Sequence, residues 1–302
     1  MKNRYLMPLM AALLLTAAGC DNSEFTEPAF LHIDAMKLEV PTMNAVSTDT
    51  GFYTSSITGV YVVMKRPGIM KEDTLGLFNL PFTTPILYNG QADYLTLSPA
   101  VRMSGKMEIT PYYTFYKRLT IKDPVFAIGD TLDLGTCATT YDITMHDMRL
   151  FEPFEPTEGT LKFDSVMQWE RNAPGEARSG KGYGYVHLAD TETHKFFTLT
   201  DSFYVTDPTK LVYLELDTRS DLDFEVYMYT SEMAGGNRKR YPVMTVYRSN
   251  EWKHLYINLG PTWRDVNHNP EFWLHFAAIN TEKKGGDVRL DNVKLITTSK
   301  TL

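Results

Sequence analysis

The chain has 302 residues, of which 43% are hydrophobic and 22% charged, and its formal net charge is −7. This length is enough for two ordinary domains behind an N-terminal leader. The acidic balance argues against a nucleic-acid partner, because phosphate backbones usually bind a basic surface.

Residues 1–19 have the pattern of a secretory leader. A short basic region precedes the apolar stretch Leu6–Ala18, which is shorter than the ~20 residues that span a bilayer. Small residues then lead to Cys20, and this end resembles the bacterial lipobox, with Ala17 where leucine is usual. We expect cleavage after Gly19 and lipidation of Cys20. The alternative is an ordinary signal peptide whose cleavage leaves a cysteine by chance.

Residues 20–29 are predicted to form a lipidated tether. Acyl chains on Cys20 would hold the protein at a membrane, since each buried CH₂ contributes about 0.8 kcal/mol, and no second hydrophobic span follows. Asp21, Glu24 and Glu27 extend the segment. Such an acidic stretch resembles the surface-export signals of Bacteroidota lipoproteins, and an ordinary solvated linker is the alternative. We expect a mature chain on the outer membrane that faces the cell exterior.

Cys137 is the other of the two cysteines in the chain. With Cys20 acylated it has no partner for an intrachain disulfide, although an extracytoplasmic compartment would permit one. No basic or histidine cluster lies near it in the sequence, so we expect a small buried residue and not a nucleophile.

Residues 30–145 are predicted to form an immunoglobulin-like β-sandwich. Helical periodicity is scarce, and short runs of β-branched and aromatic residues alternate with turn residues and prolines. The strand candidates are Phe30–Val40, Ile57–Lys65, Thr74–Leu77, Ala92–Leu97 and Lys117–Lys122. Residues 146–158 are rich in proline and glutamate towards their end, and we expect a linker there.

Residues 159–302 are predicted to form a jelly-roll β-sandwich. Three runs near the C-terminus alternate strictly, which gives each strand one apolar face for a core. A series of such strands over ~140 residues fits two packed sheets. The residues expected to point inward are Phe224, Val226, Met228, Leu255, Ile257, Leu259, Phe272, Leu274 and Phe276.

The order of several segments resembles a widespread group of Bacteroidota surface lipoproteins. These proteins have an N-terminal immunoglobulin-like sandwich and a C-terminal jelly roll like that of carbohydrate-binding modules. No single motif is very specific, and the resemblance rests on the order over nearly the whole mature chain. The segments are Ile57–Val62, Leu75–Pro81, Pro85–Leu87, Leu97–Val101, Pro111–Lys117, Glu251–Leu259 and Val288–Leu295.

No motif in the sequence indicates an enzyme. The seven histidines include no H-E-x-x-H pair, and there is no G-x-S-x-G elbow. A pair of glycosidase carboxylates leaves no sequence signature and stays open, but small sandwiches more often bind than catalyse. We therefore expect a protein without a catalytic centre.

Two acidic residues are candidates for a structural Ca²⁺ site. Asp164 and Asp291 are suggested by the equivalent acids of some carbohydrate-binding jelly rolls. Calcium needs 6–8 oxygen ligands, and the sequence does not place the others. No further cofactor is expected.

Aromatic residues occupy the side of the late strands that faces away from the predicted core. Rings with a polar group suit either a glycan or a protein interface. The alternative is that the N-terminal domain or loops cover these rings. The predicted binding residues are Tyr227, Tyr229, Tyr256, Trp273 and His275, and Trp252 and His254 lie on the same side of their strand.

The function that the sequence favours is that of an accessory or scaffolding subunit of an outer-membrane protein complex, for assembly or nutrient uptake. Its partners would be the membrane, through the Cys20 lipid, and outer-membrane β-barrels or other surface lipoproteins. The alternative function is that of a glycan-binding lipoprotein that uses its jelly-roll domain.

Overall fold

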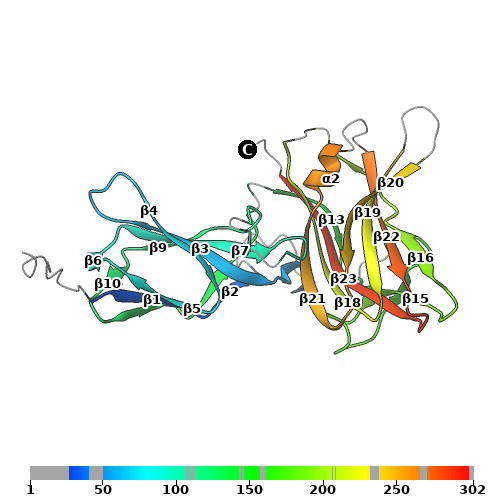
Figure 1. The fold of residues 1–302 in the computed structure, drawn as a ribbon, viewed down its shortest axis with the longest axis horizontal. Helices are drawn as coiled ribbons and strands as arrows, with labels where there is room; N and C mark the ends of the chain where they lie inside the picture. The colour runs from blue at the N-terminus through cyan, green and yellow to red at the C-terminus, as the bar shows by residue number, and fades with distance from the viewer. Residues whose placement is uncertain are drawn as a thin grey trace, which may run out of the picture.

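The computed structural model describes residues 27–40, 50–106, 109–110, 113–142, 144, 146–156, 161–205, 207, 209–231, 238–265 and 271–298. The predicted leader and Cys20 lie outside these residues. Almost all regular structure in the described part is strand, which confirms the predicted all-β class. None of the described helices has the length and apolarity needed to cross a membrane. Two sandwich domains lie end to end (Figure 1).

The N-terminal domain is built from short strands in two layers. One layer has the order β4-β3-β7, with β8 and β9 both paired to β7, and the other contains the sheets β11-β1-β5 and β12-β2. β6 and β10 form a further small pair. The strands are β1 (Ala29–Ile33), β2 (Ala35–Leu38), β3 (Ile57–Lys65), β4 (Asp73–Asn79), β5 (Phe82–Ile86), β6 (Gly90–Gln91), β7 (Tyr94–Arg102), β8 (Ile109–Thr110), β9 (Leu119–Lys122), β10 (Val125–Phe126), β11 (Thr131–Asp133) and β12 (Thr136–Thr139), with a 3₁₀ helix, η1 (Thr50–Tyr53).

The strand predicted over residues 30–40 is divided into β1 and β2. Their partners β11 and β12 run parallel to them and are interrupted at Gly135, which has a φ of +54°. Asp34 N–H donates to the Gly135 carbonyl at this break, at 2.9 Å. The division therefore follows from the partner strand, which local alternation does not reveal. The immunoglobulin-like relationship of this domain stays a prediction.

Cys137 is part of the N-terminal core. It is 6% exposed and packs with apolar residues of both layers, among them Leu31, Val60 and Leu97. Burial raises the pKa of its thiol. The predicted small buried residue is confirmed.

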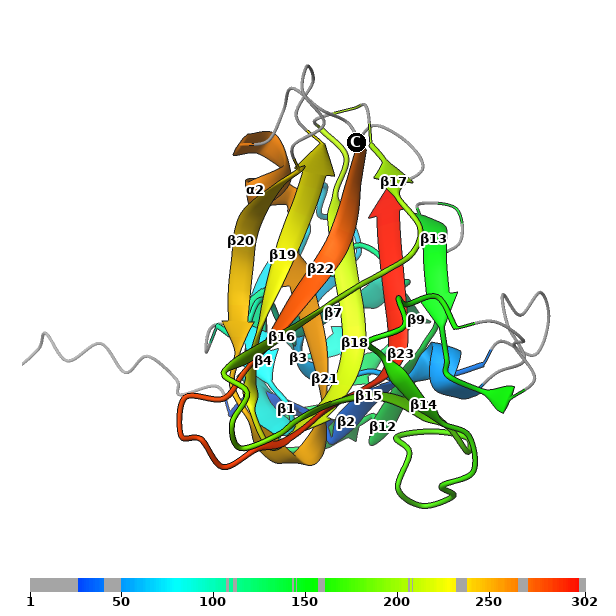
Figure 2. The same cartoon turned by 90° about the vertical axis from the view of Figure 1, so that its right-hand side faces the viewer.

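The C-terminal domain is a jelly-roll sandwich of two sheets. The junction sheet has the order β14-β15-β23-β18-β21, with β13 paired to β23, and the outer sheet has the order β16-β22-β19-β20, with β17 paired to β22. Figure 2 looks onto the outer sheet, with the N-terminal domain behind. The elements are β13 (His146–Glu152), β14 (Gln168–Glu170), β15 (Tyr183–Leu188), β16 (His194–Thr198), β17 (Phe203–Tyr204), β18 (Val212–Ser220), β19 (Asp223–Ser231), β20 (Arg238–Val246), β21 (Ser249–Asn258), α2 (Gly260–Asp265), β22 (Glu271–Ile279) and β23 (Gly286–Thr298).

The segment predicted as a linker, residues 146–158, contains a strand of the jelly roll in its first half. β13 pairs antiparallel with β23, and Leu150 and Glu152 are buried. Glu152 accepts hydrogen bonds from Phe154 N–H (2.9 Å) and Lys162 N–H (2.8 Å). Its charge made the segment look solvated, whereas backbone amides satisfy the buried carboxylate.

A third buried cluster joins the two domains. The hydroxyl of Tyr256, in β21, accepts a hydrogen bond from Ser56 N–H at 2.9 Å and lies 3.1 Å from the Tyr116 hydroxyl. The N-terminal domain therefore covers part of the outward side of the junction sheet. The buried members are Leu38, Phe52, Tyr53, Val101, Met103, Tyr113, Phe115, Tyr116, Tyr141, Tyr213, Tyr256 and Ile296.

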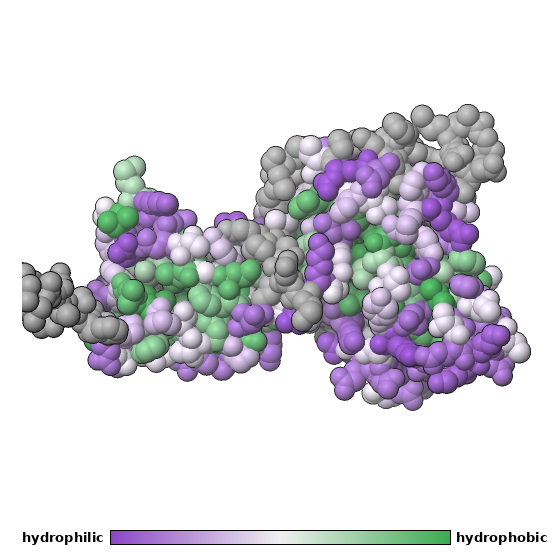
Figure 3. All heavy atoms as spheres, viewed as in Figure 1, coloured by the Kyte–Doolittle hydropathy of each residue, from purple (hydrophilic) through white to green (hydrophobic). Residues whose placement is uncertain are grey.

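Hydrophobic side chains also gather on the visible surface of the N-terminal domain (Figure 3). The large apolar residues exposed on this domain include Ile69, Met70, Leu77, Leu87, Val125 and Ile128. Met70 is 98% and Leu87 84% exposed. Exposed apolar side chains gathered in this way are typical of interaction surfaces.

Candidate functional site

The alternation of the late strands positions the candidate site. Phe224, Val226 and Met228 of β19 are fully buried in the sandwich core, as are Phe272, Leu274 and Phe276 of β22. Leu255 is partly buried against the same core, and Ile257 and Leu259 are fully buried. Every residue predicted to point inward therefore contacts the core, and the residues between them face outward.

Four of the five predicted binding residues lie together on the outward side of the outer sheet. Tyr227 is the register partner of His275, and Tyr229 is the register partner of Trp273. Phe196 of β16 joins them on the next strand. We call these five residues, Phe196, Tyr227, Tyr229, Trp273 and His275, the aromatic face.

His275 lies at the centre of the aromatic face. Its imidazole stacks on Phe196, with centroids 5.3 Å apart, and on Tyr229, with centroids 5.1 Å apart. Nδ1 lies 2.7 Å from the Thr198 hydroxyl, and Nε2 is buried without a hydrogen-bond partner among the described residues. Burial, helped by the charge of Arg240, lowers the pKa of His275 to about 4. The ring is therefore neutral at physiological pH and is stacked between the rings of Phe196 and Tyr229.

Arg240 of β20 lies over the rim of the aromatic face. Its guanidinium carbon is 4.6 Å from the Phe196 ring centroid and 5.9 Å from that of Tyr227. The Tyr227 hydroxyl donates to Glu225, two residues away on the same side of β19. The aromatic face thus combines rings with a cation, a carboxylate and tyrosine hydroxyls at its edge.

Sequence reasoning missed Phe196 and Arg240. Phe196 is 41% exposed, and Phe197 beside it is fully buried. Alternation along His194–Thr198 could have placed Phe196 outward, but pairing of β16 with β22 was needed to bring it beside His275. Arg240 belongs to the basic run Arg238-Lys239-Arg240, which the structure places at the start of β20.

Tyr256 is not part of the aromatic face, which corrects the fifth predicted binding residue. It points outward as expected, but β21 belongs to the junction sheet, and the N-terminal domain leaves Tyr256 only 2% exposed. The same alternation therefore leads to a partly exposed surface on the outer sheet and to a buried junction on the junction sheet.

Charged side chains are buried beside Tyr256. Glu215 is fully buried and accepts hydrogen bonds from Tyr113 and Tyr141, and Lys294 Nζ lies 3.3 Å from its Oε2. His254 Nδ1 lies 3.1 Å from Asp217 Oδ1. We call Glu215, Asp217, His254 and Lys294 the junction network.

The junction network shifts the pKa values of three of its members, Glu215, Asp217 and His254, in the direction of their charged forms. Burial alone would raise the pKa of Glu215, but Lys294 and His254 outweigh it, so the pKa is about 2. For Asp217, His254 likewise outweighs burial and the pKa is about 2. Burial would lower the pKa of His254, but Asp217 and Glu215 raise it. The junction network is therefore a set of buried ion pairs at the place where the two domains meet.

Of the two calcium candidates, Asp291 lies in β23 and Asp164 lies outside the strands, and backbone N–H groups donate to both carboxylates. Asp164, beside β16, accepts from Val166 N–H (3.2 Å) and Thr198 N–H (2.9 Å). Asp291, in β23, accepts from the N–H groups of residues 178, 179 and 292, and burial next to Asp217 raises its pKa well above the usual range. The described residues contain no group of three or more His, Cys, Asp or Glu that could hold a metal ion. The calcium site thus remains a prediction from the sequence alone.

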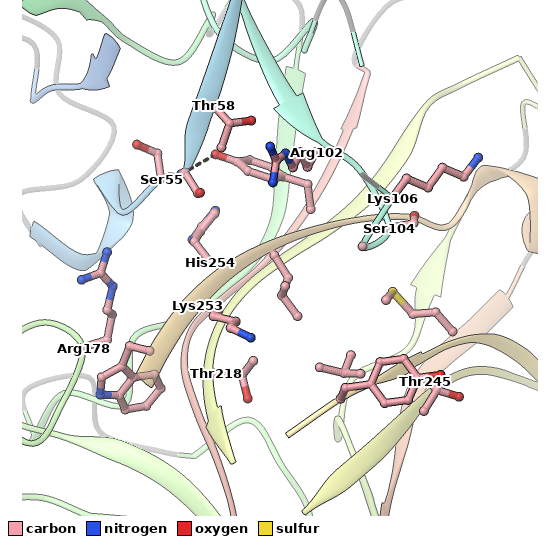
Figure 4. A pocket seen from close by; sticks show the side chains of 18 residues that line it. Ser55, Thr58, Arg102, Ser104, Lys106, Arg178, Thr218, Thr245, Lys253 and His254 are labelled. Atoms are coloured by element: carbon pink, nitrogen blue, oxygen red, sulfur yellow. Dashed lines mark hydrogen bonds between the residues drawn. The ribbon is translucent and has the colours of Figure 1, made fainter. Parts of the chain in front are cut away.

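A cleft of about 590 Å³ lies where the N-terminal domain meets the edge strands β20 and β21 (Figure 4). Ser55, Thr58 and Arg102 line it from the N-terminal domain, and Thr218 and Lys253 line it from the jelly roll. Its volume is in the range of small-molecule sites, ~300–1,000 Å³. No sequence signal pointed to this cleft, because its walls come from segments far apart in the chain.

No protein-family model and no curated protein matches the chain. Among solved structures, it is similar to a family 11 carbohydrate-binding module from Clostridium thermocellum in complex with a mixed-linked tetrasaccharide, at 16% identity and a TM-score of 0.33 over 51% of this chain and 96% of the module. A family 30 module of a cellulosomal cellulase from the same organism aligns at 13% identity and a TM-score of 0.34, over 48% of this chain and 88% of the module. A family 29 module aligns at 12% identity and a TM-score of 0.32, over 51% of this chain and 90% of the module. Likenesses this distant carry no argument about a ligand, which has to come from the geometry.

Proposed function

We propose that the chain is a non-catalytic glycan-binding protein, held at the outer membrane by the lipid predicted at Cys20. The single observation that supports it is the aromatic face, where several rings lie side by side on an exposed sheet. A sugar ring can stack its C–H side on such rings, while its hydroxyls meet polar groups at their edges. Arg240, Glu225 and the tyrosine hydroxyls supply those groups around the aromatic face.

The position of the aromatic face fits presentation to the exterior. The outer sheet lies on the side of the jelly roll away from the N-terminal domain, and β1, which follows the predicted tether, lies in that domain (Figure 1). A protein anchored through Cys20 would therefore carry the aromatic face away from the membrane.

The function is tested with the mature chain carrying Cys20→Ala and a panel of neutral polysaccharides, β-glucan, xylan and galactan, in affinity electrophoresis. We expect at least one to retard the protein, and Trp273→Ala to weaken retention roughly thirtyfold, as truncation of interface aromatics often costs ~2 kcal/mol. Tyr88→Ala, an equally half-buried ring on the N-terminal domain, is the matched control and should keep full retention. If the native chain, with Cys20 intact, does not partition into a detergent phase, the lipid anchor is absent and that part of the proposal is wrong.

A second candidate function is the accessory subunit favoured by the sequence. The exposed apolar residues of the N-terminal domain, Met70 and Leu87 above all, support it. A native pull-down that recovers outer-membrane β-barrels, together with no retention on any glycan, would replace glycan binding by this function.

A further inference from the structure

The cleft between the domains has an unusual charge for this protein. Among the described residues, its lining contains Arg102, Lys106, Arg178 and Lys253 and no aspartate or glutamate, although the whole chain has 37 acidic residues and a net charge of −7. Arg178 is paired with the buried Asp217, at 3.4 Å. Arg102, Lys106 and Lys253 are exposed, and none of them has an ion-pair partner within the described part of the chain.

The remaining walls supply hydroxyl groups and aromatic rings, of which Tyr256 belongs to the buried junction. Ser55, Thr58, Ser104, Thr218 and Thr245 carry the hydroxyls (Figure 4). The Thr58 Oγ1 atom is buried and has no hydrogen-bond partner among the described residues. Such an atom costs free energy unless a bound molecule or water completes its hydrogen bonding.

Two lining rings lie outside the buried junction, Trp252 and Tyr247. Trp252 Nε1 donates to the Glu176 carbonyl at 2.8 Å, so the indole is held in one orientation. Tyr247 is 75% exposed at the end of β20. An indole in a fixed orientation, with hydroxyl groups beside it, can stack against a sugar ring. The neighbouring cations favour a sugar that carries negative charge.

We propose that this cleft binds an acidic saccharide, with its carboxylate groups on Arg102, Lys106 and Lys253 and its rings against Trp252. An arginine can grip a carboxylate through two parallel hydrogen bonds, whereas lysine adds a point charge. The proposal rests on the proposed function for the class of ligand, but it assigns a site separate from the aromatic face and a different sugar chemistry. Neutral glycan would bind the outer sheet, and acidic glycan the cleft.

The experiment is isothermal calorimetry on the mature Cys20→Ala chain with trigalacturonate, neutral galactotriose and inorganic sulfate as probes. We expect trigalacturonate to bind through the cleft at low salt and to weaken as salt screens the exposed charges. Arg102→Gln combined with Lys253→Gln should lower that affinity tenfold or more, since hydrogen bonds to charged groups carry at least that factor. Lys195→Gln, at a partly exposed lysine of β16 in the outer sheet, is the control and should leave that affinity unchanged.

Each outcome separates the cleft from the aromatic face. Loss of trigalacturonate binding in the double variant, with full binding in Trp273→Ala, supports the cleft even if no neutral glycan binds anywhere. The proposal is overturned if trigalacturonate does not bind, if Trp273→Ala abolishes its binding, or if galactotriose binds the cleft as tightly. Sulfate binding as strong as trigalacturonate binding would show a simple anion site and overturn the saccharide assignment.

Discussion

The outward sides of the two jelly-roll sheets differ in what covers them. The outer sheet leaves Tyr227, Tyr229 and Trp273 partly exposed, whereas the N-terminal domain covers Tyr256 on the junction sheet. Each side carries one histidine beside a tyrosine, yet the pKa of His275 is lowered and that of His254 is raised. The same residue type thus has its pKa shifted in opposite directions on the two sides, because its neighbours differ.

The largest effect is expected from removing the cation of the junction network. Lys294→Met would leave the buried Glu215 carboxylate with His254 as its remaining cationic partner, and breaking one partner of a buried ion pair typically costs ~3–5 kcal/mol. Chemical denaturation should show this loss in the free energy of unfolding. Lys195→Met, which removes an exposed pair with Glu192, is the control and should cost less than ~1 kcal/mol.

Adding Glu215→Leu to Lys294→Met sharpens the result. The double variant removes both charges, so it should recover much of the lost stability. If Lys294→Met costs no more than Lys195→Met, the junction is not held by its buried charges and the comparison between the two sides fails.

An intermediate effect is expected in the titration of the two histidines. In the folded chain His275 stays neutral until the pH approaches 4, whereas in the unfolded chain it is protonated below a pKa of ~6.5. Its neutral form therefore does not reduce the free energy of unfolding above pH ~6.5, and the fold loses stability as the pH falls from there towards 4. His254 has the opposite sign, because its raised pKa stabilises the fold below ~6.5 and this contribution is lost as pH rises through the folded pKa.

Imidazole proton signals in NMR measure both groups directly. At pH 5.5, His275 should be neutral and His254 protonated. Equal titration of the two rings near pH 6.5 would contradict the environments described for them. The His275→Gln and His254→Gln variants assign the two signals.

Much of the fold follows from local pattern, and the identity of each partner strand does not. Alternation placed Phe224, Ile257 and Phe276 inward, and all three are fully buried. It also pointed Tyr229 and Tyr256 outward, but it could not assign β19 and β21 to different sheets, because that depends on pairing with strands far away in the chain.

The candidate site was predictable to the same extent. Alternation pointed Tyr227, Tyr229, Trp273 and His275 outward, and the pairing of β19 with β22 brings them together. The cleft was not predictable, because Arg102, Arg178 and Lys253 meet only through the packing of two domains. The strand at Leu150 was mistaken for a linker because its buried Glu152 is satisfied by backbone amides that no local pattern reveals.

The most direct test of the account compares Tyr256→Ala with Trp273→Ala in one measurement series. For each variant, the free energy of unfolding and the retention on the best neutral polysaccharide are measured on the same preparation. Tyr256→Ala should lose about 3–5 kcal/mol, as truncation of a buried aromatic does, and its folded fraction should keep full retention. Trp273→Ala should lose less than ~1 kcal/mol and nearly all retention. A large loss of stability in both variants, with retention following the folded fraction, would show that the aromatic face is structural and contradict the proposed function.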